Sequence, residues 1–284
     1  MYMLVQISPI KYITYLIGIS FIFIVTITNG TPIAHAAYSS NEPVILKHIE
    51  SFDSLCKRAV FTYDRGYYQQ GACYNTKNNR ILLGIVKDGY IKQKILVVNP
   101  DNMQIEKIMD YSTLGHMNTI TYRPDTNEVY VFTQLDDTGK HVAEAPNVII
   151  LDGDTLEEIR NIHLQQSIDA LDYDTKRKEF FAVRCNVENE PYTLYRYDNN
   201  FNLLEKRTYL RPFKTVGNGF AIHDGRFLHL SWNGMIEGTF FGGFIKFVLC
   251  DFSKVELEDV FYMNGHWWLA RPVGYGITEL YHVK

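Results

Sequence analysis

Short apolar runs alternate with polar turns along most of this chain. In the stretch His116–Gln134, the runs TITY and VYVFT flank the polar turn RPDTNE, and similar pairs recur to the end of the sequence. The runs are rich in Val, Ile, Thr, Tyr and Phe, and the turns in Asn, Asp, Lys and Gly. Such runs between turn formers are typical of β-strands. The pattern predicts an all-β protein.

The strand pair in His116–Gln134 belongs to one of five repeats. Each repeat begins with an inner apolar run, which reads GACY, TITY, DALDY, GFAI or DVFY. A polar turn, a second strand, a variable loop and a third strand follow, and the first four repeats close with a last strand such as QIEKIMD or LLEKRTYL. Corresponding positions lie 47, 51, 50 and 40 residues apart, and they are Gly71, Asn118, Asp169, Gly219 and Asp259.

This spacing indicates the fold class. Repeats of about 40–50 residues with four strands each are the signature of β-propeller blades. The sequence therefore predicts a five-bladed β-propeller with four-stranded antiparallel blades. A β-sandwich with evenly spaced strands is the alternative, but a sandwich has no need to repeat the same order of strands and loops five times.

The fifth repeat lacks a fourth strand, because the chain ends soon after ITELYHV. A propeller closes its ring when a strand from one terminus completes the blade begun at the other, which removes an exposed sheet edge. The isolated run VILKHI at residues 44–49 could supply that strand. The segment Ser51–Arg65 fits neither a strand nor a helix clearly. A six-bladed propeller with a degenerate blade in this segment is the alternative.

The N-terminus has the features of an export signal. Lys11 precedes an apolar run from Ile13 to Ile27, and the small-residue pattern Ala34-His35-Ala36 follows. We expect a signal peptide at residues 1–36, a linker at 37–43 and a single propeller domain at 44–284. The mature protein would then be extracellular and free of the membrane. An uncleaved membrane anchor is the alternative.

Composition narrows the function classes. The net charge of the 284-residue chain is −4, and no Lys/Arg cluster is dense enough to follow a phosphate backbone, so nucleic-acid binding is not expected. We expect a monomer. Four cysteines could form two disulfides in any of three pairings or remain as buried thiols; for a single bridge, Cys56 with Cys73 is the favoured pair.

Polar residues stand at the start of each inner run. In a propeller, these strand starts converge on one mouth of the central channel, together with the loops between the second and third strands. The sequence therefore places a ring of candidate ligand-binding side chains there: Gln70, His116, Asn118, Asp169, Asn218 and Glu258. Trp232 is a further candidate. It lies in Ser231–Phe244, SWNGMIEGTFFGGF, which we interpret as a glycine-rich loop that either contacts a carbohydrate or protein through exposed aromatic residues or only needs glycine to turn.

Three interpretations of this ring remain open. The side chains could cap backbone groups at turns. Asn118, Asp169 and Glu258 offer oxygen ligands of the kind that Ca²⁺ accepts, so the ring could hold calcium. In a catalytic interpretation, His116 acts as a base near neutral pH and Asp169 orients it. The spacing alone does not separate these interpretations.

The stretch YYQQGACYNTKNNRILLG resembles the start of a blade in the broad superfamily of secreted propellers with weak repeats. Gln70-Gly71, with Tyr68 nearby, also resembles the F-T-Q-G-L opening of the plant and bacterial type of glutaminyl cyclase, a five-bladed propeller enzyme. The acidic residue that this cyclase type carries after its second strand is absent from ILLGIVKDG, and its second-blade signature is absent from GHMNTITYRP. Gluconolactonase-like propellers are similar in placing Glu, Asn and Asp around a metal. The resemblance implies a propeller fold.

These observations favour a secreted propeller that binds a small molecule, a glycan or a protein at the channel mouth with His116, Asn118, Asp169 and Asn218. Binding is preferred over catalysis because this chain lacks the acidic residue of glutaminyl cyclases, the one enzyme family with a local match. The alternative is a propeller hydrolase, a lactonase or a glutaminyl-cyclase-like enzyme that acts on a small polar substrate.

Overall fold

The computed structural model describes most of the chain. The described residues are 21–28, 31–38, 45–49, 56–87, 90–136, 138–142, 145–185, 191–209, 217–231, 234–250 and 257–283. The chain divides into two compact units, residues 1–44 and 45–284. In the first unit, β1 (Phe21–Thr28) pairs antiparallel with β2 (Thr31–Tyr38). Within the described residues, no helix is long and apolar enough to cross a membrane. Much of the predicted export signal and linker, residues 1–20 and 39–43, lies outside the described part.

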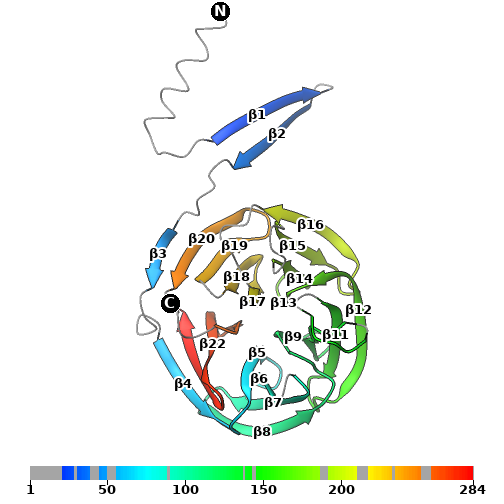
Figure 1. Cartoon of the computed structure of the whole chain (residues 1–284). Coiled ribbons are helices and arrows are strands. Elements are labelled where there is room, and N and C mark those ends of the chain that lie inside the picture. The colour runs from blue at the N-terminus through cyan, green and yellow to red at the C-terminus, as the bar shows by residue number, and fades with distance from the viewer. Residues whose placement is uncertain are drawn as a thin grey trace, which may run out of the picture. The chain divides into compact units, whose positions relative to one another are not determined.

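The second unit is a ring of five blades around a central channel, as predicted (Figure 1). Blade 1 contains β5 (Tyr68–Asn75), β6 (Arg80–Lys87), β7 (Lys92–Asn99) and β8 (Gln104–Tyr111). Blade 2 contains β9 (Thr119–Arg123), β10 (Glu128–Phe132), β11 (Ala145–Asp152) and β12 (Glu158–Ile168). Blade 3 contains β13 (Ala170–Asp174), β14 (Glu179–Arg184), β15 (Tyr192–Tyr197) and β16 (Leu203–Tyr209).

The last two blades also recruit strands from the beginning of the unit. Blade 4 contains β17 (Gly217–His223), β18 (Arg226–Ser231), β19 (Gly234–Thr239), β20 (Gly243–Cys250) and β3 (Ile45–Ile49). Blade 5 contains β21 (Asp259–Met263), β22 (His266–Gly274), β23 (Ile277–Val283) and β4 (Cys56–Thr62). Neighbouring strands in each blade are antiparallel, except that β3 runs parallel to β20.

The ring is closed by an N-terminal strand, but by a different one from that predicted. The run at residues 44–49 adds β3 to the outer edge of blade 4, whereas β4, from the ambiguous segment Ser51–Arg65, pairs with β23 and completes blade 5. The closing strand carries Phe61, which is 3% exposed and belongs to the core between blades 5 and 1. The assignment of residues 44–49 as closing strand was therefore wrong, and so was the six-bladed alternative.

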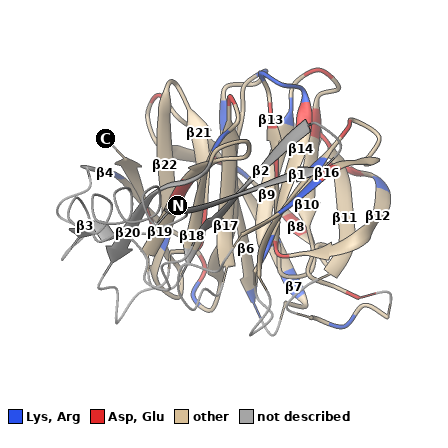
Figure 2. Ribbon diagram, turned by 90° about the horizontal axis from the view of Figure 1, so that it is seen from above, with Lys and Arg blue, Asp and Glu red and all other residues tan. Residues whose placement is uncertain are grey.

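The core consists of one apolar cluster between each pair of neighbouring blades. In β6, Leu82 packs toward blade 2, while Ile81 and Leu83 on the opposite sheet face pack toward blade 5. This alternation follows from the two-residue period of a strand. Both faces of the middle strands are buried, which explains their nearly continuous apolar runs. Most charged residues lie instead in the turns and the outer strands (Figure 2).

Blade 4 differs from its predicted form. Much of the stretch Ser231–Phe244 is the strand β19, so it is not a glycine-rich loop, and FIKFVL belongs to the fourth strand. A two-residue connection between β17 and β18 contributes to the shorter spacing of this repeat. Its first turn, Asp224-Gly225, has φ values of 53° and 73°, as a two-residue type I′ hairpin requires. Phe240 is fully buried, while Trp232 lies outside the described residues.

The favoured disulfide is also corrected. Cys73 and Cys185 are buried, and neither forms a disulfide. Cys73 belongs to the innermost strand of blade 1, whereas Cys56 begins the outermost strand of blade 5. The two positions are thus separated by the width of a blade, which is why sequence proximity misled the pairing.

Gly71 illustrates how closely the inner strands approach one another. A Cβ atom at Gly71 would lie 2.6 Å from the backbone oxygen of Met117 and 2.6 Å from Cγ1 of Ile120, both in the next blade. Gly71→Ala is expected to lower the free energy of unfolding by about 1–3 kcal/mol, measured by urea denaturation. Gly84→Ala is the matched control, because its Cβ would meet only flexible side-chain ends, the nearest at 2.9 Å. Equal losses for the two variants would contradict this explanation.

Candidate functional site: the central channel

The five inner strands, β5, β9, β13, β17 and β21, surround the channel. They all run in the same sense, because three strands lie between one inner strand and the next and the chain therefore reverses its direction four times. They all begin at one end of the channel, which we call the start face. They all end at the opposite end, the turn face, where hairpin turns lead to the second strands. The sequence analysis placed the candidate site at the start face.

At the start face, two predicted side chains link different blades. The Asn118 side-chain amide donates to the backbone oxygen of Asp169 at 2.7 Å and to that of Asn218 at 3.4 Å. The Asn218 amide donates to the backbone oxygen of Leu257 at 2.7 Å. An inner strand has an unpaired edge toward the channel, and its buried backbone groups need partners. These two amides therefore do what the capping interpretation expects.

The other polar residues of the start face are also buried. Asp169 is fully buried, and its carboxylate accepts a hydrogen bond from the backbone N–H of Cys185. The Gln70 amide donates to the backbone oxygen of Gln69 at 3.0 Å, and Glu258 is 3% exposed. Within the described residues, no group of three or more His, Cys, Asp or Glu side chains is arranged to hold a metal ion. Calcium binding by Asn118, Asp169 and Glu258 stays a prediction.

His116 has a separate environment. Its Nδ1 atom is hydrogen-bonded to the Gln134 side chain, and its ring centroid lies 4.2 Å from that of Tyr90 and 5.0 Å from that of His141. Burial lowers the pKa of His116 to about 4, so the ring is neutral at pH 7. A general base works best when its pKa is near the working pH. This environment does not favour His116 as a strong base, and its pairing with Asp169 in catalysis stays a prediction.

The turn face holds a pocket of about 250 Å³. All five inner strands contribute to its lining near their ends. Apolar side chains such as Ile120, Ile222 and Phe261 form much of the wall, and Thr175 and Asn264 lie in the turns at its mouth. The channel is therefore filled by inter-blade hydrogen bonds at the start face and hollow at the turn face.

Asp172, in the middle of β13, carries a carboxyl group into this pocket. Its Oδ2 accepts a hydrogen bond from the backbone N–H of Ile222 at 2.7 Å, and its Oδ1 accepts one from the Thr121 hydroxyl. The side chain is partly exposed through the pocket, but protein surrounds it on most sides. This burial raises the pKa of Asp172 to about 7. Asp172 thus combines access to a cavity with a perturbed pKa, a pairing that is common at functional sites.

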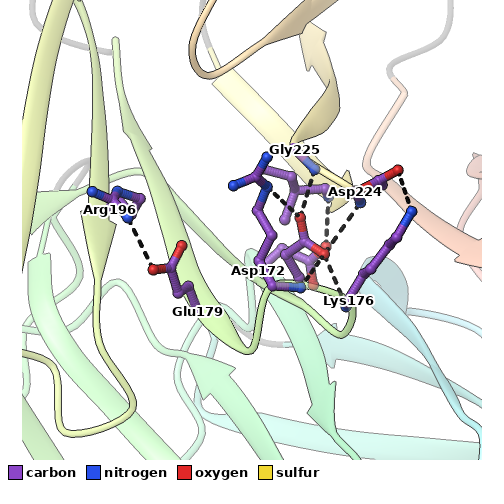
Figure 3. A network of polar contacts seen from close by, with 9 residues as sticks. Asp172, Lys176, Glu179, Arg196, Asp224 and Gly225 are labelled. Carbon is purple, nitrogen blue, oxygen red and sulfur yellow. Dashed lines mark hydrogen bonds and ion pairs between the residues drawn. The ribbon is translucent and has the colours of Figure 1, made fainter.

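A polar rim surrounds this pocket on the side of blades 3 and 4. The buried carboxylate of Asp174 accepts hydrogen bonds from the backbone N–H groups of Gly225 at 2.6 Å and Asp224 at 3.1 Å. The Nζ atom of Lys176 lies 2.6 Å from the Asp224 carboxylate. Figure 3 shows Lys176, Asp224 and Gly225 close to Asp172 in this network. The rim fixes the two hairpin turns to each other and so holds the pocket mouth in one arrangement.

An aromatic pair lies on the next part of the wall. The rings of His223 and Tyr262 stack with centroids 3.8 Å apart and an angle of 14° between their planes. Both side chains line the pocket and are partly exposed. Burial lowers the pKa of His223, although the nearby acids Asp174 and Asp224 oppose this shift. His223 is therefore neutral at pH 7 and adds an aromatic surface and not a charge.

Sequence reasoning missed Asp172. A signal was present, because Asp172 is the single acidic residue in the interior of an inner run, where the other runs carry apolar or neutral residues. A carboxylate at such a position must be buried or must face a cavity, and a buried one requires hydrogen-bond partners.

Comparisons with known proteins agree with the fold. No protein-family model matches the chain, and no curated protein matches its sequence. The glutaminyl cyclase of Myxococcus xanthus is similar in structure, with a TM-score of 0.54 at 10% identity over 81% of this chain and 99% of that one.

Two further solved structures are more distant. The Cps50 (Swd1) β-propeller domain of Myceliophteria thermophila has a TM-score of 0.47 at 7% identity, over 81% of this chain and all of that one. A nidogen/laminin complex has a TM-score of 0.48 at 8% identity over 89% of this chain and 82% of that one. At these identities the similarity concerns the fold alone.

Proposed function

We propose that this protein is a propeller that binds a small molecule in the pocket of the turn face. The observation that carries the proposal is the cavity of about 250 Å³, which all five inner strands line and into which the Asp172 carboxyl projects. Pockets for drug-sized ligands occupy about 300–1,000 Å³. The ligand is accordingly expected to be smaller than these.

The start face is not the proposed site, because the side-chain amides of Asn118 and Asn218 are engaged with backbone oxygens of neighbouring blades. The apolar run Ile13–Ile27 and the pattern Ala34-His35-Ala36 support the further proposal that the protein is exported and acts outside the cell.

The proposal is tested by obstructing the pocket mouth. Thr175 lines the mouth and is exposed, so Thr175→Trp would place an indole over the opening. We expect a panel of small amines, neutral alcohols and carboxylates, screened by ligand-observed NMR, to contain compounds that bind the wild-type protein with 1:1 stoichiometry. Thr175→Trp should weaken their binding at least tenfold.

Thr138→Trp is the matched control, because Thr138 is also an exposed threonine and lies in the loop between β10 and β11. This variant should bind the same compounds with unchanged affinity. The proposal is wrong if no compound in the panel binds, or if binding is the same in the wild-type protein and Thr175→Trp.

A further inference from the structure

The charge balance inside the pocket points to the nature of its ligand, an inference that rests on the proposed function. Asp172 is the one side chain of the described lining that can carry a full charge at neutral pH, because His223 is neutral there. No lysine or arginine is present in that lining. An anionic ligand would thus find a carboxylate and no compensating cation.

Asp172 also has no ionic partner among the described residues. Its hydrogen-bond donors are neutral groups, namely the Thr121 hydroxyl and the Ile222 backbone N–H. Two cations of the rim have acidic partners of their own, since Lys176 pairs with Asp224 at 2.6 Å and Arg177 lies 3.9 Å from Asp174. A buried carboxylate without a counter-ion is costly. A cationic group in the pocket would supply this missing partner.

Two other acids lie near Asp172, and burial raises the pKa of one of them, Asp259 at the start of β21. Asp259 is 1% exposed and interacts electrostatically with Asp172. Asp174, at the end of β13, also interacts electrostatically with Asp172. The thiol of Cys73 also faces these carboxyls, and burial raises its pKa, so it stays neutral. The groups around Asp172 are therefore acidic or neutral.

The rest of the pocket suits the body of such a ligand. Ile120, Ile222, Phe261 and Met263 provide apolar surface, and Tyr262 adds the face of an aromatic ring. Apolar walls and aromatic rings beside a carboxylate are the features that recognise organic ammonium groups. We propose that the ligand is a small organic cation, an ammonium group on a compact apolar body, and that its charge pairs with the Asp172 carboxylate.

This pairing couples binding to pH. The cation binds the ionised form of Asp172, and the pKa of this carboxyl is raised to about 7 in the empty protein. Below pH 7 a proton competes with the ligand, so affinity should rise about tenfold per pH unit up to pH 7 and then level off. Protonation of His223 would also weaken the binding of a cation at low pH. The variant His223→Gln separates this effect from that of Asp172, because it should leave the pH profile of binding unchanged.

Three probes with one ring and different charges test the assignment: cyclohexylammonium, cyclohexanol and cyclohexanecarboxylate. We expect the full-length protein to bind the ammonium at least tenfold more tightly than the alcohol or the carboxylate at pH 8, measured by ligand-observed NMR. Asp172→Asn should weaken ammonium binding at least tenfold and remove its dependence on pH. Asp110→Asn, whose side chain is 78% exposed in the outer strand β8, should change neither.

The outcomes separate the ligand class from the site. If the alcohol or the carboxylate binds as tightly as the ammonium, and Thr175→Trp weakens that binding, the pocket is the site but the cation assignment is wrong. Binding of the ammonium with full affinity to Asp172→Asn would also overturn the assignment. If none of the probes binds and no member of the wider panel binds, the proposed function fails together with this inference.

Discussion

Asp259→Ala is expected to lower the free energy of unfolding by about 3–5 kcal/mol. Oδ2 of Asp259 accepts a hydrogen bond from the backbone N–H of Ala72 at 2.5 Å, and Oδ1 accepts one from that of Val260 at 2.8 Å. The backbone of Ile120 donates a further bond to the same carboxyl. One side chain of blade 5 thus holds the inner strands of blades 1 and 2. Alanine would leave these buried donors without an acceptor, at about 1–3 kcal/mol each.

Urea denaturation at pH 7 measures this loss, and two variants serve as controls. Asp110→Ala removes an exposed carboxylate whose pair with Lys94, at 3.4 Å, lies on the surface, and it should cost less than about 1 kcal/mol. Asp259→Asn should give an intermediate loss, because one oxygen can still accept while the NH₂ group faces a donor. If Asp259→Ala is no more harmful than Asp110→Ala, the carboxylate does not join the blades.

The fold could be predicted because its signal is repeated. The same order of strand, turn and strand recurs in the sequence of each blade. Five copies of the pattern make the assignment clear even where a single copy is ambiguous. The closing strand could not be identified in this way, because residues 44–49 and β4 both lie outside the repeats, and β4 mixes charged with apolar residues. Pairing with β23 depends on the burial of Phe61 against blade 1, a contact between the two ends of the unit that no local pattern contains.

The site was less predictable for a related reason. Both ends of every inner strand carry polar residues, and the sequence does not say which of them face a cavity. At the start face, the side-chain amides of Asn118 and Asn218 donate hydrogen bonds to backbone oxygens of adjacent blades. At the turn face, Asp172 retains access to a pocket. The difference depends on how five separate segments meet around one axis, which spacing along the chain does not encode.

Asp172→Asn is expected to stabilise the empty protein at pH 8 by about 2–4 kcal/mol. The pKa of Asp172 is raised to about 7 in the folded state by burial, whereas an aspartate in an unfolded chain titrates near its ordinary value of about 3.9. The folded state therefore binds the proton more tightly. This contribution to stability is complete below about pH 4, and it is lost as the pH rises through 7.

Asparagine removes the charge but keeps the size of the side chain. Its amide oxygen can accept from the Ile222 N–H, and its NH₂ group can donate to the hydroxyl oxygen of Thr121, which rotates to accept. Thermal unfolding of the wild-type protein and Asp172→Asn should therefore diverge between pH 4 and pH 8, with the variant more stable at the higher pH. Asp110→Asn, with its exposed side chain, should follow the wild-type curve throughout.

The sign of this effect separates a functional from a structural carboxylate. A residue whose role is to hold blades 2, 3 and 4 together would, on losing its charge, destabilise the protein at every pH. A residue kept for a cationic ligand lowers the stability of the empty protein, and the ligand restores it by neutralising the charge. Loss of stability in Asp172→Asn at both pH 4 and pH 8 would show that Asp172, like Asp259, serves the packing of the inner strands.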